Sequence, residues 1–99
     1  MKEIAKALEK NKTLLYLNLS NNQLEEIIGN QFIESTFVNW DLISLEIGFN
    51  DLLLIQIQEI WKNIMRNKAI YDEWWLKEWR ERKWMAEEEA LMRVFVLEE

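Results

Sequence analysis

The chain has 99 residues, no cysteine, no histidine and a formal net charge of −6. This length allows one domain with a small core, because a short chain buries only roughly 60 to 65% of its unfolded surface. The missing Cys and His exclude disulfides and thiolate or imidazole metal sites. The negative charge disfavours nucleic acid as a partner, since phosphate binding requires a basic face.

Two stretches of the chain repeat one another: residues 14–24 read LLYLNLSNNQL, and residues 42–52 read LISLEIGFNDL. Equivalent positions lie 28 residues apart, as with Leu14 and Leu42, and a fixed period of this length indicates an internal repeat. The same offset relates Asn11, Asn39 and Asn67. Within each stretch the apolar residues alternate as in a short half-buried strand, whereas the segments between have the spacing of amphipathic helices.

The pattern LxxLxLxxNxL in both stretches resembles the leucine-rich repeat family, and the period is similar to that of its helix-backed, ribonuclease-inhibitor-like subclass. The resemblance covers residues 1–70. It implies an α/β fold, a short leucine-rich-repeat solenoid of two full coils with parallel strands backed by helices, ending in a long C-terminal α-helix. The expected coils are about residues 1–24 and 25–52, with an aborted third from residue 53.

The resemblance also implies a structural ladder, in which leucines fill the interior and buried asparagines bind the backbone of the turns. The expected ladder residues are Asn22, Asn50, Leu17, Leu19, Leu45 and Ile47. The strand face that similar proteins use for partners carries Tyr16, Asn18, Ser44 and Glu46. An equal alternative is that these four are ordinary exposed strand positions.

The pattern stops after Ile70, where Glu73, Trp75 and Glu78 stand at the consensus positions. Residues 71–99 contain no Gly or Pro and are rich in good helix formers, and Asp72 is suited to be an N-cap. We therefore expect residues 71–99 to form a separate C-terminal capping or docking helix.

This tryptophan-rich helix has three interpretations. Trp75 and Trp79 lie one turn apart and would seal the open end of the last coil, as the terminal caps of repeat arrays do. Alternatively, the helix projects and docks on another protein, because Trp and Arg are enriched in binding hot spots. A third interpretation folds the helix back as core, and interrupting charges disfavour a regular coiled coil. The expected partner-binding residues on this helix are Trp74, Trp79, Trp84, Leu91 and Phe95.

No chemistry-bearing motif is present. There is no phosphate-binding glycine loop, and Gly29 and Gly48 stand alone as close-packing or turn positions. Without His or Cys, catalysis would require paired carboxylates or a Lys in a defined cleft, and no such pair is evident. We predict that the protein is not an enzyme, with no catalytic, cofactor-binding or metal-binding residues and no small-molecule substrate.

The function expected from these features is a non-catalytic protein–protein interaction or scaffolding subunit, or a fragment of one, held in a larger assembly with other proteins. No apolar run approaches the ~20 residues that span a bilayer, so a membrane is not expected as a partner. Nucleic acid is not expected either, because the net charge is −6. The resemblance to ciliary and other cytoskeletal leucine-rich repeat proteins implies a cytoplasmic location in a cytoskeletal setting, such as the axoneme of a cilium. The alternatives are a regulatory module similar to tropomodulin, which caps actin filaments, and an engineered repeat cap.

Overall fold

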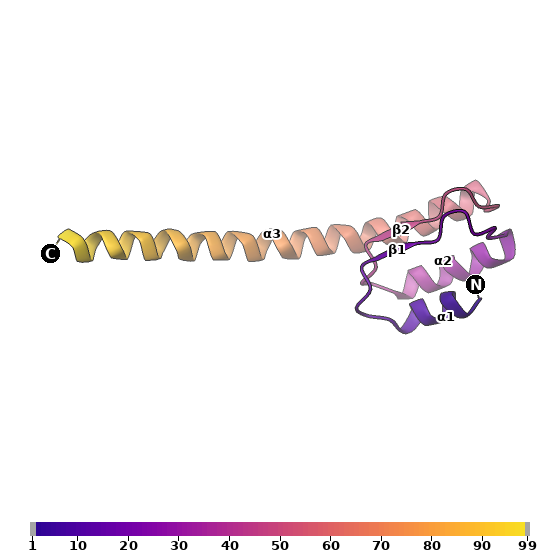
Figure 1. The fold of residues 1–99 in the computed structure, drawn as a ribbon, viewed down its shortest axis with the longest axis horizontal. Coiled ribbons are helices and arrows are strands. Elements are labelled where there is room, and N and C mark those ends of the chain that lie inside the picture. The colour runs from indigo at the N-terminus through magenta and orange to yellow at the C-terminus, as the bar shows by residue number, and fades with distance from the viewer. Residues whose placement is uncertain (1, 99) are drawn as a thin grey trace.

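The computed structural model describes the backbone of residues 2–98 and the side chains of residues 2–83. The elements are α1 (Lys2–Lys10), β1 (Tyr16–Asn18), α2 (Glu26–Val38), β2 (Ser44–Glu46) and α3 (Leu54–Glu98). In Figure 1, α1, α2 and the first part of α3 lie with the two strands at one end of the molecule, and the rest of α3 projects from it. The molecule therefore measures 72 × 23 × 19 Å.

The expected fold class is wrong. The chain is mostly helical, with helices of 9, 13 and 45 residues, and over residues 2–98 it forms two strands of three residues each. No solenoid of two leucine-rich-repeat coils is evident. The reason lies in α3, where helix-forming residues continue without Gly or Pro and carry the chain away from the strands. Two short strands also fall below the three or so stacked units that a solenoid needs.

The boundary expected at residue 71 is not a helix start in the structure. The helix begins at Leu54 and passes through this position without a break. The expectation that Asp72 is an N-cap is wrong, because Asp72 lies inside α3, where its carboxylate accepts a hydrogen bond from Lys68 one turn earlier.

The two strands form a parallel pair at the 28-residue offset seen in the sequence, with Tyr16 beside Ser44 and Asn18 beside Glu46. The pair is short because the chain turns immediately after β1. Asn21 and Gln23 have φ angles of 57° and 56°, in the left-handed region that a strand does not enter.

The core lies between the helices and the turns that flank the strands. The apolar side chains with the least exposure are Phe32, Leu24, Leu42 and Ile60, and α1 contributes Ala5 and Leu8. Because Ile60 belongs to α3, the first part of the long helix is part of the core. The second part of α3 projects from the globular end into solvent.

Asn39 joins the end of α1 to the end of α2. Its side chain is 3% exposed, and its Nδ2 donates to the carbonyl oxygens of Leu8 (2.7 Å) and Asn11 (3.0 Å). Its Oδ1 accepts hydrogen bonds from the backbone amides of Asp41 and Leu42. One side chain thus satisfies four backbone groups, one in α1 and three in the segments that follow α1 and α2.

Asn67 continues this arrangement one period later. It is 1% exposed, and its Nδ2 donates to the carbonyl oxygens of Asn39 and Leu42 at 2.8 Å each. Whereas Asn39 stands at the C-terminal end of α2, Asn67 lies in the interior of α3. The asparagine therefore fastens α3 laterally to the preceding turn while the helix itself continues.

Gly29 is a close-packing position, as expected from the sequence. A Cβ at this residue would lie 2.5 to 2.8 Å from the side chain of Gln56. That amide is buried, donates to the Glu26 carbonyl oxygen and Asn30, and accepts from the Leu53 amide.

We expect Gly29→Ala to lower the free energy of unfolding by about 1 to 3 kcal/mol, because displacing the Gln56 side chain breaks buried hydrogen bonds. Urea unfolding followed by circular dichroism measures this, with Gly48→Ala as the control, since nothing lies within 4 Å of a Cβ there. An unchanged stability of the Gly29 variant would show that Gln56 moves without loss.

Candidate protein-binding surface

The expected ladder residues divide into two groups. Leu19 and Ile47 are buried in the core, and Leu17 and Leu45 are partly buried against it. The apolar members of the ladder therefore have a structural position, and none of them presents a free surface large enough to be a site by itself.

The two ladder asparagines differ from the expectation that both are buried. Asn50 is half-buried, and its Oδ1 accepts from the amides of Asn22 and Leu24 while its Nδ2 donates to the carbonyl oxygens of Leu19 and Ile47. Asn22 is exposed, and its side chain donates to the nearby Ser20 carbonyl oxygen, two residues earlier. Asn50 organises the turns, whereas the side chain of Asn22 contributes one local bond.

The strand-face residues are accessible, with Tyr16 66% exposed, Asn18 and Glu46 exposed and Ser44 partly exposed. The Asn18 side chain is engaged locally, because its Oδ1 accepts from the Ser20 amide at 2.9 Å. Of the four, Tyr16 and Ser44 line a groove that the structure forms beside β2.

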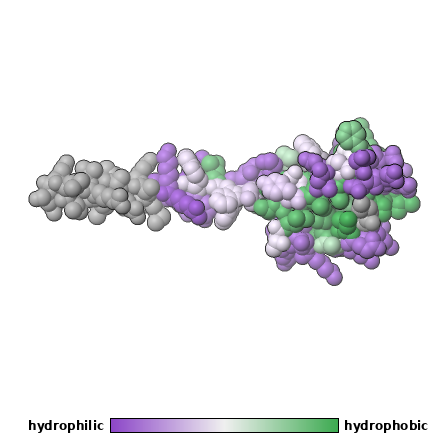
Figure 2. Space-filling model, in the orientation of Figure 1, coloured by the Kyte–Doolittle hydropathy of each residue, from purple (hydrophilic) through white to green (hydrophobic). Residues whose placement is uncertain are grey.

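This α3–β2 groove has a volume of about 390 Å³. It lies between α3 and the sheet, on the side of β2. Among the described strands, β2 is paired with β1 and with no other strand. Its lining is largely apolar or aromatic and comprises Tyr16, Ile43, Ser44, Leu45, Trp61, Ile64, Met65, Lys68, Tyr71 and Asp72. In Figure 2 the apolar surface of the molecule gathers on the globular end between hydrophilic borders.

The tryptophans of the projecting part are exposed: Trp74 by 53%, Trp75 by 43% and Trp79 by 57%. Trp75 makes edge contacts with Trp74 (4.9 Å between ring centroids) and with Tyr71 (6.2 Å), and Lys83 lies 5.1 Å from the Trp79 ring. These contacts are all within α3. The interpretation of Trp75 and Trp79 as a seal is therefore wrong, because the helix leaves the globular end before it reaches them.

The interpretation of this helix as folded-back core is wrong for the same reason over residues 74–83. The remaining expected docking residues, Trp84, Leu91 and Phe95, have side chains outside the described part of the structure.

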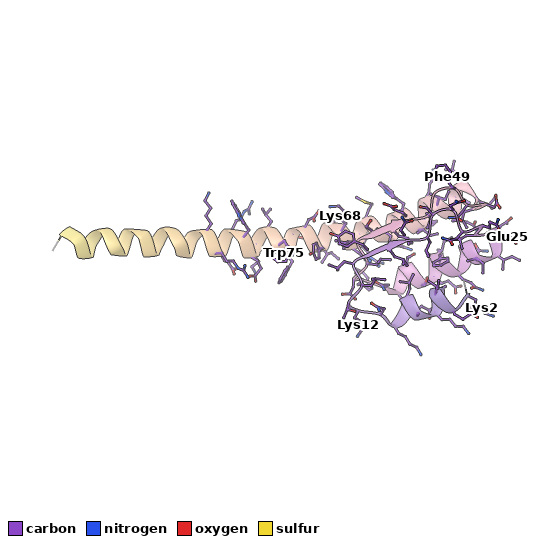
Figure 3. The ribbon with its side chains drawn as sticks, in the orientation of Figure 1. Lys2, Lys12, Glu25, Phe49, Lys68 and Trp75 are labelled. Atoms are coloured by element: carbon purple, nitrogen blue, oxygen red, sulfur yellow. The ribbon has the colours of Figure 1, made fainter. Side chains whose placement is uncertain are left out.

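An ion pair marks the point where α3 leaves the globular end. Lys68 Nζ lies 2.8 Å from Asp72 Oδ2, and the two side chains are 47% and 59% exposed. The hydrogen bond to Asp72 raises the pKa of Lys68. Figure 3 shows Lys68 beside the strands and Trp75 on the projecting part beyond it.

One face of α3 joins the groove to the projecting aromatics. We name it the α3 seam, and it consists of Trp61, Met65, Lys68, Asp72, Trp75 and Trp79. The steps between these residues alternate between four and three, which places them on a single stripe of a helix. None of them is buried.

Sequence reasoning missed the part of this seam before residue 71, including Trp61 and Met65. The signal was present as the alternating spacing, but it crosses the boundary at which the C-terminal helix was expected to begin. It becomes apparent once α3 is one helix.

Comparison of the chain with protein-family models, with curated proteins and with solved structures gave no match. Of the helices, as far as the structure describes them, none combines the length and apolarity needed to cross a membrane. Within the described residues there is also no group of three acidic side chains arranged to hold a metal ion. The α3–β2 groove and the exposed aromatics of α3 form the candidate site, because they adjoin one another along a single helix.

Proposed function

We propose that the chain is a non-catalytic protein–protein interaction or scaffolding subunit held in a larger assembly. The observation that supports this best is the set of tryptophans, 43 to 57% exposed, on a helix that extends beyond its own core. Exposed apolar area costs about 25 cal/mol per Å² relative to burial, and contiguous exposed patches mark interaction sites. Trp is also among the residues most enriched in binding hot spots.

The groove supports the same proposal, because it places a second apolar surface next to the projecting helix. A concave surface lined by Ile43, Leu45 and Trp61 is suited to apolar side chains of a helix. The exposed tryptophans of α3 and the α3–β2 groove occur on the same molecule. The chain therefore has both the apolar helix and the groove that a helix-in-groove contact needs.

The finer features of this function stay predictions of the sequence resemblance. They are the cytoplasmic location, the cytoskeletal or ciliary setting, and the alternative of a regulatory module similar to tropomodulin. The absence of enzymatic activity is likewise a prediction.

Sedimentation velocity of the full chain over a range of concentrations tests the proposal, with circular dichroism reporting the fold. We expect the wild-type chain to associate and Trp75→Ala/Trp79→Ala to associate at least about 30-fold more weakly, since a hot-spot Trp contributes 2 kcal/mol or more. The variant should keep its helix content, because Ala is the better helix former and both rings are about half exposed, with their aromatic and cation contacts to residues of α3.

Phe49→Ala is the matched control, because Phe49 is 90% exposed in a turn outside α3 and should leave association unchanged. A wild-type chain that is a monodisperse monomer with cooperative unfolding at every concentration would overturn the proposal.

A further inference from the structure

We propose that the occupant of the α3–β2 groove is the projecting part of α3 from a second copy of the chain, in an antiparallel two-fold dimer. This inference rests on the proposed function and names its partner. The α3 wall of the groove extends from Trp61 to Asp72, and the exposed Trp75 and Trp79 follow it along the same α3 seam. A two-fold axis perpendicular to α3 at the level of residue 70 therefore brings the tryptophans of each copy onto the groove of the other copy.

The spacing between the seam residues is the same when the helix is followed in either direction. Steps of four, three, four, three and four residues separate them, so reversal of one helix preserves every contact layer. An antiparallel pair centred on position 70 aligns Trp61 with Trp79, Met65 with Trp75 and Lys68 with Asp72, each with the residue of the second copy. A closed two-fold contact requires this kind of self-complementary surface.

The charges at the centre of the seam select the antiparallel direction. Lys68 of one copy faces Asp72 of the second, and Asp72 faces Lys68, so the two ion pairs form one alternating group of four charges. A parallel pair in the same register would instead set Lys68 against Lys68 and Asp72 against Asp72, and like charges directly opposite each other disfavour an interface. The 2.8 Å contact within each copy already holds both side chains on the seam.

The exposed tryptophans supply a substantial part of the area that a stable contact buries. Trp61 is 62% exposed, and with Trp75 and Trp79 it gives each copy about 300 Å² of exposed indole surface, if a buried aromatic ring covers 150–250 Å². A standard interface buries about 800 Å² per partner, and the groove walls that the rings cover add to the indole area. Helix geometry spaces residues 61 and 79 about 27 Å apart, which is the length of groove and projecting segment that the pair overlaps.

Charge-reversal variants test the proposal because they separate contacts between copies from contacts within one copy. Lys68→Glu places two negative charges on each copy at the seam centre, four in the dimer, and Asp72→Lys places two positive charges on each copy, again four in the dimer. Each variant alone should dimerise at least about tenfold more weakly than the wild type in sedimentation velocity, because both ion pairs become repulsive. An equimolar mixture of the two should recover a heterodimer of near wild-type affinity.

Mixing cannot restore the ion pair inside either chain, so recovery in the mixture reports contact between copies alone. Lys77→Ala is the control for the face, because Lys77 is exposed on α3 and lies off the seam, and it should leave the dimer unchanged. Circular dichroism of each single variant should match the wild type, since both side chains are exposed.

Introduced cysteines test the register in a chain that has none. A mixture of Met65→Cys and Trp75→Cys chains should form a mixed disulfide under mild oxidation. Met65→Cys alone should not, because the two copies of residue 65 would stand about 15 Å apart along the antiparallel helices, beyond the roughly 7 Å that a disulfide spans.

The outcomes distinguish this inference from the function on which it rests. Association that depends on Trp75 and Trp79 but is unaffected by charge reversal and is not recovered by mixing would overturn the two-fold seam and leave the proposed function standing. Rapid disulfide formation by Met65→Cys alone would also overturn it in favour of a parallel pair. A wild-type chain that stays monomeric at every concentration would overturn both.

Discussion

Asn39→Ala should lower the free energy of unfolding by about 3 to 5 kcal/mol. The substitution removes four hydrogen bonds and leaves the carbonyl oxygens of Leu8 and Asn11 and the amides of Asp41 and Leu42 without this partner. A buried polar group left unsatisfied costs about 1 to 3 kcal/mol, and part of this cost is recovered where solvent reaches the exposed ends of the turns. The loss would be among the larger effects of a single substitution.

Chemical unfolding followed by far-ultraviolet circular dichroism gives this free energy. Asn22→Ala is the matched control, because Asn22 is exposed and its side chain makes one local hydrogen bond; we expect a loss below about 0.5 kcal/mol. Equal effects of the two substitutions would contradict the assignment of Asn39 as the residue that joins the ends of α1 and α2.

Arg66→Met should lower the free energy of unfolding by about 2 to 4 kcal/mol. The Arg66 guanidinium donates from α3 to the carbonyl oxygens of Thr36 (3.2 Å), Phe37 (3.0 Å) and Asn39 (2.9 Å), which end α2, and it lies 3.6 Å from the centre of the Trp40 ring. A cation at a helix C-terminus is favourable, and hydrogen bonds from charged groups contribute about 1.5 to 3 kcal/mol. Methionine retains the apolar stem and removes these interactions.

Burial lowers the pKa of Arg66 in the folded state. Taken alone, this shift destabilises the folded state at pH values below the pKa of the unfolded chain, where the guanidinium is charged. An Arg side chain nevertheless remains protonated at every pH at which proteins fold, so the effect of Arg66→Met should be the same in mildly acid and mildly alkaline buffer. Arg66→Lys should recover part of the loss by keeping the charge without the planar fork, and exposed Arg80→Met should change stability by less than about 0.5 kcal/mol. A strongly pH-dependent effect of Arg66→Met would contradict this assignment.

The 28-residue offset in the sequence carried correct local information. It placed Tyr16 beside Ser44, and it related Asn11, Asn39 and Asn67, because each period presents the same polar requirement where one unit meets the next. The offset did not predict how far each asparagine side chain is buried. Asn22 matches the consensus position as well as Asn50 does, yet it is exposed. Asn50 bonds to Leu19, Asn22 and Leu24 of the preceding stretch, whereas among the described residues no strand precedes β1 to play this part for Asn22.

The fold class was not predictable from that offset because a repeat pattern does not say where a helix stops. Residues 54–70 fit a helix of the repeat, and residues 71–99 fit a helix of their own. With no Gly or Pro at the junction, the free energy of helix propagation favours joining them. The junction residue Asp72, suited to a cap in isolation, instead accepts a hydrogen bond inside the helix.

The candidate site was predictable in part. Trp74 and Trp79 are exposed, as a docking role of the helix requires, and the role itself stays a prediction. The groove was not predictable, since it brings Tyr16 and Met65 together across 49 positions of the chain through the packing of α3 against β2.

The continuity of α3 has a mechanical consequence. A helix that runs unbroken from the core at Ile60 to the tip of the molecule transmits a sideways load as a lever, with no hinge at the point of exit. The load arrives at Arg66 and Asn67, whose bonds to the end of α2 and the following turn lie close to the fulcrum. Force on the tip is therefore concentrated on these two neighbouring residues, and we expect pulling on the C-terminal end to detach α3 from α2 before either helix unwinds.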